Sequence, residues 1–363
     1  MRMNRKDFFK KSIALGVTIS FSGYLFENKL MAESATKHVL PFEGIMAFDA
    51  HSHPYHLHHP PLSPYGRIKH LRTTATVSRM KEAGLVGSVF AALGDSVKIK
   101  GSNVSAYTDT IEQIERIENF ERKKKIRLVS NVSDLKFTGN NDLFAAIMAI
   151  EGGDALEGDI TNIDRFHEKG VRLITILHKI DNEIGFNQES KFDGQLTPFG
   201  KKVVEKMNEK GMIVDVAHSN TLTLKSVSEV SQLPLLDSHT APFPESEENN
   251  FPNRARSWNE MELIAKSGGV ICTMPIAYKL GSYERTTLAH WASEILLMKN
   301  RLGIEHVGLG SDNAGLPSLV EGWESIASLP DLIEELLKIG LSEKDILAFT
   351  GGNFLRIASK CLH

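Results

Sequence analysis

Short apolar runs alternate with longer mixed segments along most of the chain. Eight of the short runs are rich in strand-forming residues and predict β-strands at residues 45–51, 86–93, 145–151, 172–178, 212–218, 233–240, 269–274 and 306–312. A ninth apolar run, at 126–131, predicts a short peripheral strand. Strands that alternate with helical segments are typical of βαβ units and therefore of a parallel sheet.

Helical periodicity fills several of the intervals. In residues 110–125 the apolar side chains recur every three positions, at Ile111, Ile114, Ile117 and Phe120, with charged residues between them. Further helices are predicted at 198–210, 260–267, 288–302 and 330–340.

Eight strands interleaved with helices favour an α/β fold, a single (β/α)₈ TIM-type barrel over residues 36–363. A doubly wound open sheet is the alternative architecture. The first predicted strand is not followed by a glycine-rich phosphate loop, which counts against nucleotide binding.

Composition narrows the class of protein. Of 363 residues, 41% are hydrophobic and 24% charged, which is typical of a folded globular chain. Lys and Arg number 42 against 45 Asp and Glu, so nothing in the charge balance predicts nucleic acid as a partner. Two cysteines, Cys272 and Cys361, are too few for a disulfide scaffold or a cysteine-rich zinc site.

The N-terminus resembles a targeting segment. A basic stretch is followed by an apolar run over 13–26 that is too short and too weakly apolar for a membrane span. Residues 4–10 (NRKDFFK) resemble a bacterial twin-arginine signal, with Lys6 in place of the second arginine. We therefore expect an export signal or signal anchor within 1–35, a periplasmic location, and no stable membrane span once the signal is removed.

Candidate chemistry lies at the ends of the predicted strands. The active site of a (β/α)₈ barrel is built at the carboxyl ends of its strands. Histidine or an acid recurs there, at His51, His53, Glu151, His178, His218, His239 and Asp312. Imidazoles with carboxylates suit zinc or a similar divalent ion. The set exceeds what one tetrahedral zinc needs, and a carboxylate such as Glu151 can bridge two ions.

Other polar residues near these positions have open roles. Asp49, Asp215 and Asp237 precede rim histidines, and either orient the imidazoles or serve as structural acids. The histidines of a proline-rich loop, His56, His58 and His59, are interpreted as loop residues.

From about residue 45 to 358 the chain resembles the membrane dipeptidase (renal dipeptidase) family of the amidohydrolase superfamily. The resemblance rests on several short motifs in a fixed order: 48–53 (FDAHSH), 150–152 (IEG), 196–200 (LTPFG), 215–219 (DVAHS), 237–239 (DSH), 306–312 (HVGLGSD) and 352–356 (GNFLR).

The resemblance implies a zinc-dependent dipeptidase that uses a metal-bridged hydroxide to hydrolyse a small peptide substrate. It implies two divalent ions, most simply Zn²⁺, with His51 and His53 on the first, His218 and His239 on the second, and Glu151 bridging both. Asp312 would accept the proton of the attacking water, and His178 would approach the scissile carbonyl oxygen. Arg256 would pair with the terminal carboxylate of the substrate, with Arg254 as the alternative. A homodimer is compatible with the resemblance.

Two motifs depart from the family pattern. His53 stands where the family commonly has aspartate, and residues 310–315 read GSDNAG where the family usually reads GGDFDG. The missing second acid of the last motif leaves one alternative open, another binuclear-metal amidohydrolase that acts on a lactone, a phosphoester or an N-acyl amino acid. A separate alternative is an inactive exported binding protein.

Overall fold

Eight parallel strands form a nearly closed barrel. The computed structural model describes residues 47–53, 76–123, 125–137, 143–242, 254–280, 283–313 and 315–363. Neighbouring strands pair in the order β1 (Ala47–Ser52), β2 (Leu85–Leu93), β4 (Phe144–Glu151), β5 (Val171–Thr175), β6 (Ile213–Asp215), β7 (Leu236–Pro242), β9 (Val270–Thr273) and β12 (Val307–Leu309). Just beyond β12 the chain returns to β1, where the Asp312 amide donates to the His51 carbonyl at 3.0 Å. The predicted barrel is confirmed, and the open-sheet alternative is wrong.

The eight predicted strands are all present, but several end earlier than the apolar runs suggest. The run at 172–178 forms a strand only over Val171–Thr175, and the run at 212–218 only over Ile213–Asp215. His178 and His218 therefore lie in the loops that follow these strands. The predicted peripheral strand is β3 (Ile126–Leu128), which pairs with the start of β4.

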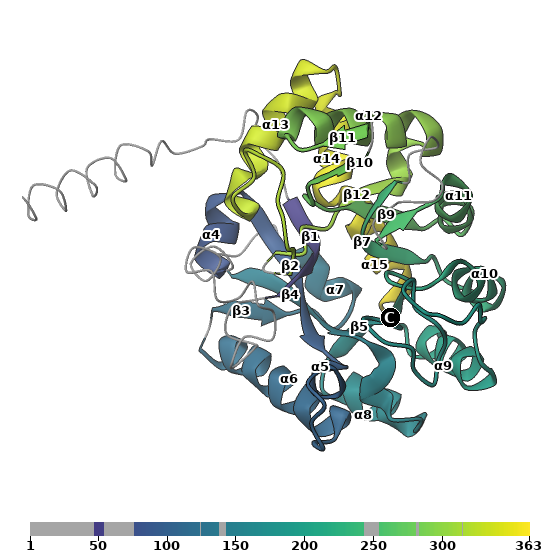
Figure 1. Ribbon diagram of the computed structural model, residues 1–363. Coiled ribbons are helices and arrows are strands. Elements are labelled where there is room, and N and C mark those ends of the chain that lie inside the picture. The colour runs from purple at the N-terminus through teal and green to yellow at the C-terminus, as the bar shows by residue number, and fades with distance from the viewer. Residues whose placement is uncertain are drawn as a thin grey trace, which may run out of the picture. The chain divides into compact units, whose positions relative to one another are not determined.

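Helices surround the strands (Figure 1). The five predicted helices are confirmed as α6 (Ala106–Arg122), α9 (Pro198–Glu209), α11 (Trp258–Lys266), α12 (Leu288–Leu302) and α13 (Leu329–Lys338). The pattern missed α4 (Val77–Glu82), α5 (Ser96–Ile99), α7 (Val132–Phe137), α8 (Thr161–Glu168), α10 (Thr221–Val230), α14 (Glu343–Leu347) and α15 (Asn353–Cys361). Among the described residues, no helix has the length and apolarity to cross a membrane.

The strands bury one set of side chains inside the barrel and the other set beneath the helices. In β4, Ala145, Ile147 and Ala149 join a cluster with alternate residues of the other strands, which is the barrel interior. Ala146, Met148 and Ile150 point the opposite way and pack with the helices. By the same alternation Glu151, the last residue of β4, faces the interior.

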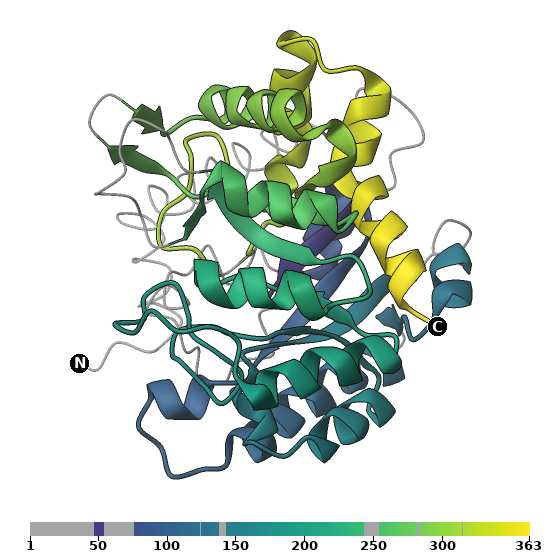
Figure 2. The same cartoon turned by 90° about the vertical axis from the view of Figure 1, so that its right-hand side faces the viewer.

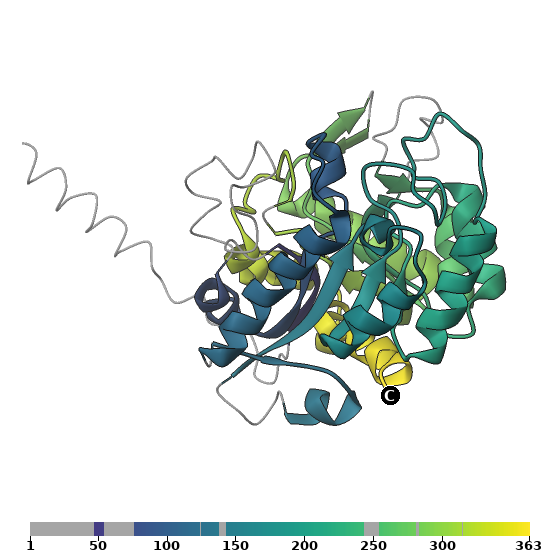
Figure 3. The same cartoon turned by 90° about the horizontal axis from the view of Figure 1, so that it is seen from below.

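The two ends of the barrel are covered differently. At one end α15 packs into the interior cluster, and the ring of Phe354 stacks on Phe48 with centroids 5.2 Å apart. Near the other end lies a hairpin of β10 (Tyr278–Leu280) and β11 (Tyr283–Arg285). Figures 2 and 3 show the hairpin and the C-terminus on opposite sides. The carboxyl ends of the strands lie on the hairpin side, which leaves that end for the functional site.

The predicted export segment and His56, His58 and His59 lie outside the described residues.

Candidate metal centre

Four histidines and one glutamate converge at the carboxyl end of the barrel. His51 lies in β1, Glu151 ends β4 and His239 lies in β7. His53 follows the end of β1, and His218 lies three residues beyond the end of β6. All five are buried, with no more than 6% of any residue exposed.

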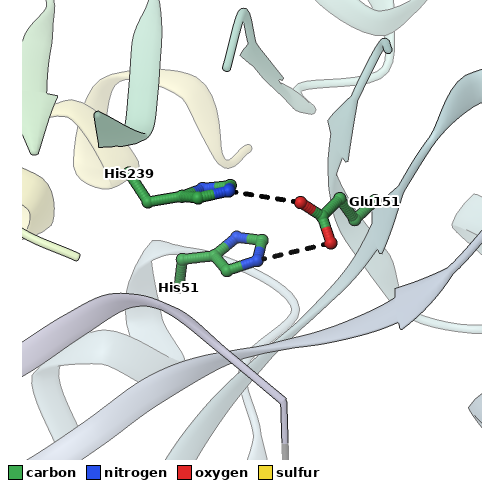
Figure 4. A group of neighbouring side chains, drawn as sticks. All are labelled: His51, Glu151 and His239. Carbon is green, nitrogen blue, oxygen red and sulfur yellow. Dashed lines mark ion pairs between the residues drawn. The ribbon is translucent and has the colours of Figure 1, made fainter. Parts of the chain in front are cut away.

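The carboxylate of Glu151 lies between two pairs of imidazoles. Its Oε1 is 2.9 Å from Nε2 of His218 and 3.2 Å from Nε2 of His239. Its Oε2 is 3.2 Å from Nε2 of His53 and 3.7 Å from Nε2 of His51. Figure 4 shows His51 and His239, whose rings face different oxygens of the Glu151 carboxylate.

The spacing of these nitrogen and oxygen atoms fits divalent cations. The Nε2 atoms of His51 and His53 are 3.2 Å apart, and those of His218 and His239 are 3.1 Å apart. Within the described part of the chain, Oε2 of Glu151 is buried without a hydrogen-bond partner. Neutral imidazole nitrogens and carboxylate oxygens are the usual ligands of zinc in a catalytic site. The residues present therefore suit a cation on each side of Glu151.

The electrostatics of the centre favour positive charge. Burial lowers the pKa of His218 and of His239 well below the usual value, so both rings are neutral, as metal ligation requires. Burial alone would raise the pKa of Glu151, but the surrounding imidazoles hold it well below its usual range. Burial would lower the pKa of His53 as well, but contact with Glu151 and the charge of Asp312 raise it to about 9, so a cation bound at this ring would displace its proton.

The three acids that precede the rim histidines have different partners. Asp49 accepts hydrogen bonds from the amide and hydroxyl of Ser311, and so ties β1 to the loop after β12. Asp215 accepts a hydrogen bond of 2.6 Å from the Ser238 hydroxyl, which also contacts imidazole rings. Asp237 is paired with an arginine. Only Asp215 therefore reaches an imidazole nitrogen, and it does so through one intervening hydroxyl.

Asp312 and His178 border the same centre. Oδ1 of Asp312 is 3.5 Å from Nε2 of His53. Asp312 also borders a small pocket, together with Ser311, Asn313, Leu316, Leu319, Trp323, Glu324 and Ser325. Nε2 of His178 is 3.8 Å from Oε2 of Glu151. On its other side, Nδ1 of His178 lies 2.8 Å from Oδ1 of Asp95, which is fully buried.

Backbone strain is concentrated at this centre. Among the described residues, three other than glycine have positive φ, and two of them are His218 (φ 65°) and Asp312 (φ 44°). A left-handed conformation costs such residues about 1–3 kcal/mol, and it persists where the surrounding structure enforces it. Both residues lie three positions beyond the end of a barrel strand, His218 after β6 and Asp312 after β12.

The two candidate arginines have different surroundings. Arg256 is fully buried, and its guanidinium bonds to Asp237 at 2.8 Å, to Glu260 at 3.2 Å and to the carbonyls of Val216 and Ser219. Nη2 of Arg254 donates to the His239 carbonyl at 2.8 Å. Its Nη1 is buried and finds no hydrogen-bond partner among the described residues.

The charge of Arg254 acts on the metal centre. Burial lowers the pKa of Arg254, while the nearby carboxylates, first Asp237 and then Asp312 and Glu151, raise it. Its positive charge in turn helps to lower the pKa of His218 and of His239, after burial. Arg254 therefore bonds to the backbone of one of the converging histidines, whereas the guanidinium of Arg256 is enclosed by protein partners.

The family follows from a comparison of the whole chain with known proteins. The family model described as membrane dipeptidase (peptidase family M19) matches residues 43–361. The chain belongs to this family. Dipeptidase aclJ of Aspergillus oryzae is 29% identical over 287 residues, covering 76% of this chain and 66% of that protein. Dipeptidase 3 of Macaca fascicularis is 27% identical over 294 residues, covering 78% of this chain and 57% of that protein. The chain thus spans less than two thirds of the length of these relatives.

Solved structures share the fold of this membrane dipeptidase family member. The probable dipeptidase PvdM of Pseudomonas aeruginosa superimposes with a TM-score of 0.74 at 20% identity, over 92% of this chain and 99% of that one. A metallo peptidase of Rhodobacter sphaeroides, liganded with a phosphinate mimic of the dipeptide L-Ala-D-Ala, gives a TM-score of 0.74 at 18% identity. That match covers 88% of this chain and all of the other.

Asp95 is a residue of the site that the rim pattern missed. It lies two residues beyond β2, at a strand end like those of the predicted ligands. Besides its contact with His178, its Oδ2 accepts the Lys179 amide at 3.1 Å. The same rule that selected the other strand ends would have found it.

We expect Asp95→Ala to lower kcat/KM about 10- to 100-fold, the cost of losing a hydrogen bond to a charged group. His178 would lose the acceptor that fixes its ring. Steady-state kinetics with a candidate dipeptide substrate measure the effect, with metal content as the control. In a His178→Ala background the same substitution should cost little more, because its partner is already gone. Additive losses would contradict the assignment.

Proposed function

We propose that this chain is a metal-dependent dipeptidase that hydrolyses the peptide bond of a small dipeptide. The observation that carries the proposal is the carboxylate of Glu151, each oxygen of which faces its own pair of imidazoles beside Asp312. His51 and His53 would hold one divalent ion, His218 and His239 the other, and Glu151 both. Such ions, most simply Zn²⁺, supply a nucleophile from water at neutral pH and polarise the carbonyl group.

The remaining side chains provide proton transfer and orientation. Asp312 is 9% exposed and lies at the edge of the centre, where it can accept the proton of the attacking water and pass it to the leaving amine. His178, fixed by Asp95 at Nδ1, directs Nε2 toward the centre. From there it can donate a hydrogen bond to the scissile carbonyl oxygen as negative charge develops.

Arg254 is the better placed of the two arginines to bind the substrate carboxylate. Its buried Nη1 has no hydrogen-bond partner in the described parts of the chain, and the fixed fork of a guanidinium matches a carboxylate. The guanidinium of Arg256 is instead occupied by Asp237, Glu260 and two carbonyls. These contacts support a structural role for Arg256 and a substrate-binding role for Arg254.

The roles proposed for Arg254 and Arg256 predict different effects when each arginine is replaced with methionine. Arg254→Met should raise KM for dipeptides about 10- to 100-fold through loss of a charge-assisted hydrogen bond. Arg256→Met should instead destabilise the fold by about 3–5 kcal/mol, because Asp237 is left buried without its partner. Dipeptides and their C-terminal amides distinguish the roles, since Arg254→Met should lose discrimination between them. If Arg256→Met folds and loses that discrimination while Arg254→Met keeps it, the roles are reversed.

The proposed activity is tested by metal analysis and hydrolysis on the same preparation. We expect two equivalents of zinc per chain and cleavage of a dipeptide that a chelator abolishes and added zinc restores. If the protein binds two metal ions but does not cleave the dipeptide, its substrate would be another amide or an ester. A chain that takes up no metal would contradict it. The export signal within 1–35, the periplasmic location and the homodimer remain predictions.

A further inference from the structure

One hydroxyl contacts imidazoles from both halves of the centre. Oγ of Ser238 lies 2.8 Å from Nδ1 of His239 and 3.3 Å from Nδ1 of His51. The two rings stack with centroids 4.0 Å apart, and Figure 4 shows them side by side. His51 borders one oxygen of Glu151 and His239 the other, so Ser238 supports one ring on each side.

The direction of these hydrogen bonds follows from Asp215. Its Oδ1 accepts the amides of Ala217 at 3.1 Å and Ser238 at 3.0 Å. Its Oδ2 accepts the hydroxyls of Thr175 at 2.5 Å and Ser238 at 2.6 Å. Burial, and after it the charge of Asp237, raise the pKa of Asp215, but all four of these neighbours are donors, and the two backbone amides can only donate. The single proton of the Ser238 hydroxyl therefore points to Asp215.

The direction of the hydrogen bond from Ser238 to Asp215 fixes which nitrogen of each neighbouring imidazole carries a hydrogen. With its proton donated to Asp215, the Ser238 oxygen has two lone pairs left, one for each neighbouring ring. His51 and His239 must then both carry a hydrogen on Nδ1, and in a neutral ring of this tautomer the lone pair lies on Nε2. Those Nε2 atoms face Glu151, where the proposed cations would bind. A partner at the other ring nitrogen is what normally sets the tautomer and orientation of a metal-binding histidine.

We propose that Ser238 is a shared positioning residue, which holds one imidazole of each metal site in its ligating tautomer. The proposal rests on the metal centre of the proposed function. It goes further in making the two sites interdependent: a single side chain, itself not a ligand, supports both. Loss of its hydroxyl should weaken both binding events, whereas a group that contacts only one ring should affect one.

The test is zinc binding to metal-free protein in competition with a chromophoric chelator, which needs no substrate. We expect Ser238→Ala to weaken both zinc-binding events about 10- to 100-fold, the usual cost of losing a partner of a metal-ligating histidine. Ser238→Cys keeps most of the volume but offers a weaker donor and acceptor, and should act in the same direction. Circular dichroism and thermal unfolding of the metal-free proteins establish that each variant folds.

Two control variants separate the shared contact from general disturbance. Ser219→Ala removes a buried hydroxyl beside His218 that has no hydrogen-bond partner among the described residues, and should leave both affinities near those of the parent. Thr175→Val removes the other hydroxyl on Oδ2 of Asp215 without touching either ring, and should also leave zinc affinity nearly unchanged.

The outcomes distinguish this inference from the proposed function. If Ser238→Ala leaves both affinities intact, or weakens only one, the shared role is wrong while the metal centre stands. If Thr175→Val weakens both sites as much as Ser238→Ala does, the Asp215 network as a whole, and not the contact of Ser238 with the rings, is responsible. If the parent protein takes up no zinc, both the proposed metal centre and the proposed role of Ser238 are wrong.

Discussion

Replacing Glu151 with glutamine should abolish both metal retention and dipeptide hydrolysis. Glutamine keeps the size of the side chain, but its amide nitrogen is a donor and cannot ligate a cation. Since each oxygen of Glu151 faces its own pair of imidazoles, one substitution disturbs both proposed ion sites. We expect activity to fall at least about 10³-fold, because metal binding lowers the pKa of water from about 15.7 to about 7.

Elemental analysis and steady-state kinetics on the same preparation measure this effect. Glu183→Gln is a suitable control, because Glu183 follows β5 on the same rim but is half exposed, with a lysine 3.9 Å away. That variant should keep its metal and its activity. Glu151→Gln protein that retained two zinc ions and full turnover would show that this carboxylate does not bridge them.

The barrel strands were predictable because strands buried on both faces appear in the sequence as continuous apolar runs. All eight residues of β4, FAAIMAIE, are buried, and the run ends at the acid that lies between the imidazoles. The helix α10 was not predictable in this way. Its sequence, TLTLKSVSEV, is rich in residues of weak helix propensity, and the helix depends on the Asn220 cap and on burial of Leu224 and Val227.

The identity of the rim residues was easier to predict than their partners. Histidines and acids at strand ends were found because parallel strands bring their carboxyl ends to one side of the barrel. Which nitrogen a ring presents can depend on a contact from another strand, as with Ser238 of β7 and His51 of β1, and such a contact is not visible in a local pattern. Arg254 and Arg256 would share a face in a strand, but Arg254 lies before β8 (Ala255–Arg256) and bonds to the backbone of His239 instead of the partners of Arg256.

Asp312→Asn should separate catalysis from metal binding. Asparagine has the same shape as aspartate but cannot accept a proton from the attacking water. The loss of a positioned general base typically costs about 10²- to 10⁴-fold in rate. We expect kcat to fall by this factor while KM and zinc content stay near the parent values. Asparagine is preferred to alanine because Asp312 has φ 44°, a conformation that asparagine tolerates.

The zinc content and the kcat of the Asp312→Asn variant together identify the role of Asp312. Asp312 lies 3.5 Å from Nε2 of His53, close enough that its loss could act through the metal instead of the proton. If zinc content falls in parallel with kcat, Asp312 supports an ion site and another group carries the proton. If both zinc and turnover are retained, Asp312 has neither role. A fall in kcat alone leaves proton transfer as its function, because the metal centre and substrate binding are then both intact.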